Sequence, residues 1–101
     1  MKLSFSASAI ADLKRLRAFL DPKNPTAAGR AAQAIRRSLA VLEAQPRLGR
    51  QVAGLQPEFR EWAIAFGASG YIARYHLEPD RIVILAIRHQ REAGFDPTPP
   101  W

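Results

Sequence analysis

The chain has 101 residues, carries a formal net charge of +6 at pH 7 and contains no cysteine. The absence of cysteine excludes disulfide bonds and thiolate metal sites, and the length fits one domain, over residues 1–101, with a single modest core. No stretch approaches the roughly 20 apolar residues of a membrane span. Charged residues from Asp12 onward interrupt the N-terminal segment too early for a signal peptide. We therefore expect a cytoplasmic protein.

The basic surplus favours three kinds of partner, which are a nucleic acid, an acidic protein and an anionic surface. A solvated basic surface without a dedicated partner explains the charge equally well. A nucleic-acid surface would interleave aromatic and basic residues. The basic residues Arg74, His76 and Arg88 lack an obvious stacking ring, because the nearby Tyr71 and Tyr75 should point to the opposite face of their strand.

The first half of the chain predicts a short strand and two helices. Ser6 is the expected N-cap of the first helix, since its hydroxyl can accept a hydrogen bond from a free amide in the first turn. Asn24 followed by Pro25 marks the start of the second helix, because proline is tolerated at the first helical position. Small residues on the inner side of the second helix allow the two helices to approach closely. The predicted segments are a strand over residues 1–5 and helices over 7–20 and 25–44, so that residues 7–44 form an antiparallel helical hairpin.

Three short segments rich in β-branched and aromatic residues follow, and each is bounded by turn residues. In the second segment Tyr71 and Tyr75 share one face and Arg74 lies on the other, which is typical of a sheet with one covered face. The third segment is apolar on both faces and should lie inside the sheet. Strict alternation places Ile87 on the face opposite Ile84. The predicted strands cover residues 59–66, 71–77 and 81–88.

A helical hairpin followed by a three-stranded antiparallel meander predicts an α+β fold, in which the helices cover one face of a single sheet. A turn-rich connection over residues 46–57 leads into the sheet region, which spans residues 58–92. The tail over residues 93–101 is rich in proline and is not expected to form regular structure. Its aromatic residues, Phe95 and Trp101, either dock on the domain or leave the tail frayed.

The end of the third strand is the first place to look for a functional site, because charged residues follow the most apolar strand directly. His89 beside Arg91 is compatible with catalysis, since histidine titrates near neutral pH and arginine stabilises phosphate. However, no carboxylate is fixed beside His89 in the sequence, and a lone histidine at a strand end is usually structural or solvated. His76 and His89 lack the further ligands that a metal ion requires.

Two ion pairs are predicted near these strands. Glu92 can pair with Arg88 where the third strand ends. Arg60 and Glu61 can form a cross-strand ion pair, which at an exposed position would add only about 0–1 kcal/mol. Neither pair by itself indicates a functional site.

Five short motifs occur in order along the chain: residues 24–28, 46–52 and 60–61, Tyr71 with Tyr75, and residues 84–92. As an ordered set they resemble the ParE/RelE superfamily of type II toxins, and its ParE branch in particular. The resemblance implies a strand, a helical hairpin and an antiparallel sheet, in agreement with the pattern described above. It also implies a toxin that is neutralised by a cognate antitoxin and, in the ParE branch, a toxin that acts on DNA gyrase.

The RelE branch of the same superfamily cuts mRNA on the ribosome, which requires groups that activate the 2′-hydroxyl and stabilise the phosphate. By resemblance, a basic residue of the second strand falls at or near Ile72, which can do neither. Arg91 matches a basic position in both branches, and the C-terminal aromatic is Phe95, which has no hydroxyl. We therefore expect a binding inhibitor rather than an enzyme. The alternatives are the RelE-type nuclease and a basic nucleic-acid-binding domain without toxicity.

We expect the two partners of such a toxin to use different surfaces. The predicted target contacts are Arg88, His89 and Arg91, together with Arg60 and Arg74. The antitoxin is expected to fold as an extended acidic segment along the hairpin and a sheet edge. Its predicted contacts are Leu13, Leu16, Arg17, Leu20, Arg30 and Arg37. No catalytic or metal-binding residue, cofactor, membrane contact or sequence-specific binding of nucleic acid is expected.

Overall fold

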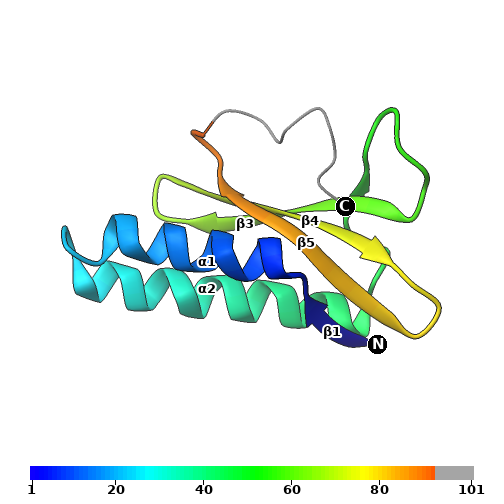
Figure 1. Ribbon diagram of the computed structural model, residues 1–101, viewed down its shortest axis with the longest axis horizontal. Helices are drawn as coiled ribbons and strands as arrows, with labels where there is room; N and C mark the ends of the chain where they lie inside the picture. Colours follow the sequence, from blue (N-terminus) through cyan, green and yellow to red (C-terminus); the bar gives the residue numbers. More distant parts are fainter. Residues whose placement is uncertain (93–101) are drawn as a thin grey trace.

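The computed structural model describes residues 1–92, so the predicted tail over residues 93–101 lies outside the described residues. The elements are β1 (Lys2–Phe5), α1 (Ala7–Leu20), α2 (Pro25–Ala44), β2 (Arg50–Gln51), β3 (Phe59–Phe66), β4 (Ser69–Leu77) and β5 (Arg81–His89). The strands form one sheet in the order β1-β5-β4-β3-β2, with β1 parallel to β5 and all other neighbours antiparallel (Figure 1). The predicted α+β fold is confirmed.

The helices begin where their capping residues predict. Ser6 accepts a hydrogen bond through Oγ from the Ala9 amide at 3.0 Å, and Asn24 accepts one through Oδ1 from the Ala27 amide at 3.0 Å. Pro25 is the first residue of α2. The two helices lie side by side against the sheet, α1 over β5 and α2 over β3 (Figure 1). Within residues 1–92, no helix is both long and apolar enough to cross a membrane.

A β-bulge changes which face of β5 enters the core. The prediction that Ile87 lies on the face opposite Ile84 is wrong, because the pairing of β4 with β5 shifts by one residue and leaves Leu85 as the extra residue. Ile82, Ile84 and Ile87 are all fully buried in one cluster under the helices, with Tyr75 of β4. The interior position predicted for this strand is confirmed.

The connection before β3 contains a short strand that the sequence pattern does not reveal. Arg50 and Gln51 form β2 and pair with Glu61 and Arg60 at the edge of the sheet. A strand of two residues is too short to show an alternating pattern, so only its partners on β3 define it. The sheet therefore has two outer strands, β1 and β2, of which β1 is the longer.

Candidate functional site

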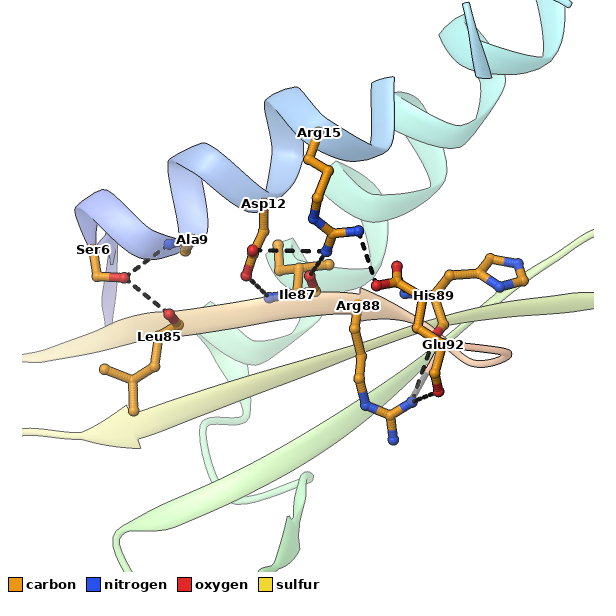
Figure 2. Close-up of polar contacts among 9 residues, drawn as sticks. All are labelled: Ser6, Ala9, Asp12, Arg15, Leu85, Ile87, Arg88, His89 and Glu92. Carbon is orange, nitrogen blue, oxygen red and sulfur yellow. Dashed lines mark hydrogen bonds and ion pairs between the residues drawn. The ribbon is translucent and has the colours of Figure 1, made fainter. Parts of the chain in front are cut away.

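The second half of β5 is held by side chains from α1 and its N-cap (Figure 2). β1 pairs only with the first half of β5, so the backbone groups farther along need other partners. Ser6 donates through Oγ to the Leu85 carbonyl oxygen at 3.0 Å. Asp12 accepts from the Ile87 amide at 2.9 Å, and Arg15 donates to the Ile87 carbonyl oxygen at 3.5 Å. These bonds fix β5 close to the point where it leaves the sheet.

Glu92 extends this attachment to the β5 end, a name used here for residues 88–92. Its carboxylate pairs with the Arg15 guanidinium at 2.8 Å and accepts from the His89 amide at 3.0 Å. Burial raises the pKa of Glu92, but the His89 amide and the Arg15 charge outweigh it, so the pKa lies below its ordinary value. The partner of this carboxylate is therefore Arg15 and not, as predicted, Arg88. The Arg88 guanidinium lies 3.5 Å from the backbone oxygen of Glu92.

Both ring nitrogens of His89 are engaged. Nε2 lies 3.0 Å from Ser69 Oγ, and Nδ1 accepts from the Arg91 amide at 3.1 Å. Because Nδ1 accepts this hydrogen bond, the neutral ring carries its proton on Nε2 and can donate a hydrogen bond to Ser69 Oγ. The ring also contacts the edge of Tyr71, with ring centroids 5.4 Å apart. His89 therefore has no free nitrogen with which to remove a proton from a substrate.

The side chains of Arg60 and Tyr75 bind the backbone of the loop that precedes β2. Arg60 is buried, and its guanidinium donates to the carbonyl oxygens of Arg47 at 3.0 Å and Gly49 at 2.8 Å. The Tyr75 hydroxyl donates to the Pro46 carbonyl oxygen at 2.8 Å and accepts from the Gly49 amide at 2.9 Å. A Cβ atom at Gly49 would lie 2.3 Å from that hydroxyl, so glycine is required where the loop crosses the ring.

Glu61 is the acidic centre of the same region. It pairs with Arg74 at 2.7 Å and with Arg50 at 3.0 Å, so the predicted Arg60–Glu61 ion pair at an exposed position is wrong. Adjacent residues of a strand point to opposite faces, and this separates Arg60 from Glu61. Burial raises the pKa of Glu61, but the hydrogen bonds and charges of Arg74 and Arg50 outweigh it and lower the pKa. We call Arg60, Glu61, Arg74 and Tyr75 the Arg60 cluster.

A groove of about 320 Å³ runs between α1 and α2, and we call it the helix groove. The small residues of α2 lie on its wall, and the two helices are in contact, as their small side chains predict. The floor is apolar, and two arginines, Arg17 and Arg36, border it. The remaining lining residues are Phe5, Leu13, Leu16, Leu20, Ala28, Ala31, Ala32, Ile35, Leu39 and Tyr71.

Comparison with known families shows to which family the chain belongs. Residues 3–94 match the family described as "ParE toxin of type II toxin-antitoxin system, parDE". The chain belongs to the ParE toxin family. The predicted superfamily is therefore confirmed, and the protein is the toxin of a type II toxin–antitoxin system.

Two relatives of this ParE-family toxin carry RelE names, and a solved structure of similar fold carries a ParDE name. It is 38% identical over 81 residues to "Toxin RelE3" of Caulobacter vibrioides, covering 80% of this chain and 85% of that protein. It is 34% identical over 87 residues to "Toxin RelE1" of the same organism, covering 86% and 90%. Its fold is similar to a chain of the "Chromosomal ParDE TA system from P. aeruginosa", with a TM-score of 0.70 at 22% identity, covering 88% and 95%.

The residues predicted for the target do not form one surface of the ParE-family toxin. Arg91 is exposed, Arg88 and His89 are half-buried at the β5 end, and Arg60 is only 8% exposed. Arg74 is occupied by Glu61. Of the residues predicted to contact the target, only those at the β5 end are accessible in the free toxin. Contact between these residues and a target stays a prediction.

The residues predicted for the antitoxin divide in a similar way. Leu13, Leu16, Arg17 and Leu20 all line the helix groove, whereas Arg30 and Arg37 are exposed on α2 outside its lining. Arg36 also lines the groove, but it is not among the residues predicted to contact the antitoxin. A helical projection gives the signal that would have found it, because Arg36 lies four residues after Ala32, on the same side of α2.

Proposed function

We propose that this ParE-family toxin stops growth by binding DNA gyrase without covalent chemistry of its own, and that a cognate antitoxin neutralises it from the helix groove. The observation that most strongly supports the antitoxin site is the helix groove, an apolar hollow between two helices with basic residues at its border. Open apolar surfaces rimmed by polar groups are typical of protein-binding sites. The membership of the similar P. aeruginosa chain in a ParDE system supports a paired partner.

The shape of the groove favours a segment that folds as it binds. Its apolar side chains would pack on Leu13, Leu16 and Leu20, and its carboxylates would lie beside Arg17 and Arg36. Phe5 also lines the groove, so the groove leads to β1, the longer outer strand of the sheet. A chain leaving the groove can therefore add main-chain hydrogen bonds along β1.

Salt should reveal this mode of binding, because basic residues at the border would steer an acidic segment. We expect the association rate to fall as ionic strength rises, while dissociation changes less. The variant Leu16→Ser should weaken antitoxin binding mainly by faster dissociation. The control is Val41→Ser, which changes an exposed apolar residue of α2 outside the groove lining. An association rate indifferent to salt would contradict the proposal.

Four residues near the expected nuclease positions, His89, Tyr71, Tyr75 and Ile72, are poorly suited to RNA cleavage, whereas Arg91 fits either branch. The Nδ1 and Nε2 atoms of His89 are both engaged. Burial raises the pKa of Tyr71 and of Tyr75, which makes them poorer proton donors at neutral pH. Ile72 of β4 faces the open side of the sheet, between Ala63 and Arg88, and offers no polar group. These observations favour a binding inhibitor.

The names of the two Caulobacter relatives favour the second candidate, a ribosome-dependent nuclease of the RelE type. One experiment separates the two. Purified toxin is added to gyrase supercoiling reactions and, in parallel, to ribosomes programmed with a defined mRNA. We expect inhibition of supercoiling, intact mRNA, and relief of inhibition by the antitoxin. Cleavage of the mRNA together with unaffected supercoiling would assign the protein to the nuclease branch.

A further inference from the structure

Phe19 of α1 is the most exposed large apolar residue among residues 1–92, with 66% of its surface accessible. It points away from the core that Leu16 and Leu20 contact. A single exposed apolar residue needs no explanation. Phe19, however, borders two hollows, and this second feature suggests a binding surface.

The two hollows lie on the side of α1 that faces the β5 end. The first, of about 260 Å³, is walled mainly by apolar residues, including Leu20, Phe66 and Tyr71. The second, of about 600 Å³, is bordered by Arg15 of α1 and by residues of the β5 end, including Arg91. Phe19 and Leu16 line both hollows. An apolar side chain can therefore enter the first hollow while the rest of a bound segment crosses the second.

The charges around Phe19 favour an acidic occupant. The Lys23 ammonium lies 4.0 Å from the centre of the Phe19 ring and donates to the Phe19 carbonyl oxygen at 3.3 Å. Arg15 and Arg91 line the second hollow. The acidic group there, Glu92, already pairs with Arg15 and accepts from the His89 amide. The surface thus keeps a positive charge that carboxylates of a partner can complement.

From this arrangement we infer that Phe19 anchors a second protein-binding surface, and that its occupant is an acidic segment of the toxin's target carrying a large apolar side chain. The inference rests on the proposed function and adds α1 to the contact predicted at the β5 end. One face of the Phe19 ring is already covered by Lys23, and the first hollow is apolar, so a protein side chain fits this surface better than a stacked nucleotide.

The antitoxin is a less suitable occupant, because the helix groove lies on the other side of the same helix. Leu16 and Leu20 line both the groove and the first hollow, and so form a wall with a ligand site on each side. A partner in the groove and a partner at Phe19 would contact this wall from opposite sides. The two sites can therefore influence one another while using different contacts.

The test compares Phe19→Ala with Ile10→Ala, which truncates an exposed apolar residue on the same helix outside both hollows. Both variants should have the melting temperature of the wild type, since neither residue is buried. We expect the concentration that half-inhibits gyrase supercoiling to be at least about tenfold higher for Phe19→Ala than for the wild-type toxin. The affinity of Phe19→Ala for the antitoxin should be unchanged. Ile10→Ala should behave as the wild type. Equal potency of the two variants would overturn the inference, as would an equal loss of antitoxin affinity in Phe19→Ala.

A second measurement keeps the inference testable if gyrase is not the target. A synthetic peptide rich in Glu and Asp with one central Trp is titrated against the full toxin while the antitoxin fills the helix groove, so that binding in the groove does not mask binding at Phe19. The fluorescence of the peptide is followed. We expect about tenfold weaker binding to Phe19→Ala than to Ile10→Ala, whether or not gyrase is inhibited. Identical binding to both variants would refute the surface. Binding of oligo-dT that only Phe19→Ala abolishes would overturn it in favour of a nucleic-acid site.

Discussion

Arginine serves two different purposes in the Arg60 cluster and at the β5 end. In the cluster, Arg60 is buried and donates to backbone oxygens, and Arg74 is paired with Glu61. At the β5 end, Arg91 is exposed in the turn that follows β5, a strand bound by α1 side chains. The cluster uses its charges to build the loop and sheet edge, whereas the β5 end presents a charge to the surroundings. The difference teaches that the same residue type is part of the fold at one place and is accessible to a partner at the other, and that burial separates the two.

The largest effect should come from breaking the cluster with Arg60→Ala. The carbonyl oxygens of Arg47 and Gly49 would lose their charged donor, and we expect unfolding to become easier by about 3 kcal/mol, given the strength of charge-assisted hydrogen bonds. Urea unfolding measures this. The control Arg50→Ala removes an exposed partner of Glu61 and should cost only about 0–1 kcal/mol. Similar losses in both variants would show that burial does not set the difference.

Tyr75→Phe should have the next largest effect. It removes one hydroxyl that serves both the Pro46 carbonyl oxygen and the Gly49 amide, and we expect a loss of about 2 kcal/mol in unfolding free energy. Hydrogen exchange at the Gly49 amide should become faster at the same time, because that amide loses its acceptor. A loss of stability without faster exchange would indicate repacking of the core rather than release of the loop.

Arg91→Ala sharpens the other side of the comparison. We expect the unfolding free energy to change by less than about 0.5 kcal/mol, as is usual for exposed positions, and half-inhibition of gyrase to need about tenfold more toxin. The matched control is Arg81→Ala, an exposed arginine at the opposite end of β5. Destabilisation by Arg91→Ala would make this residue part of the fold. Equal potency of the two variants would place the target contact elsewhere.

Acid should produce the smallest effect and again separate the two regions. The pKa of Glu61 is lower in the folded chain, so its contribution to stability is full above the ordinary value of 4.5 and is lost as pH falls through the lowered pKa. Glu61→Gln should remove part of the acid sensitivity seen in unfolding curves between neutral pH and pH values below 4.5. Glu92→Gln should act with the same sign but more weakly, since the Glu92 side chain is 34% exposed. A variant curve parallel to the wild type through this range would contradict the assignment.

Local signals predicted the parts of this fold that local chemistry decides. Ser6, Asn24 and Pro25 set the helix starts through contacts within a few residues, and both helices occur over their predicted ranges. The bulge at Leu85 depends instead on how β5 meets β4. β2 exists only through its pairing with β3. Neither is encoded in a short window of sequence, so neither was predicted.

The same distinction explains the outcome at the candidate site. Helical spacing places Leu13, Leu16 and Leu20 on one side of α1, and all three line the helix groove. Their contact with an antitoxin stays a prediction. Charge alone grouped Arg60 with Arg91, although Arg60 is buried by a loop that is distant in sequence. Separating such residues requires knowledge of what covers each one.

The bonds between α1 and β5 also carry a consequence for the growing chain. Ser6 and Asp12 are synthesised well before their partners on β5, which follow 79 and 75 residues later. Until β5 has emerged from the ribosome, β1 has no neighbour in the sheet, and closing so long a loop slows folding. We therefore expect that a ribosome stalled before residue 81 releases a fragment without a finished sheet. The sheet of the toxin can be completed only after β5 has been synthesised.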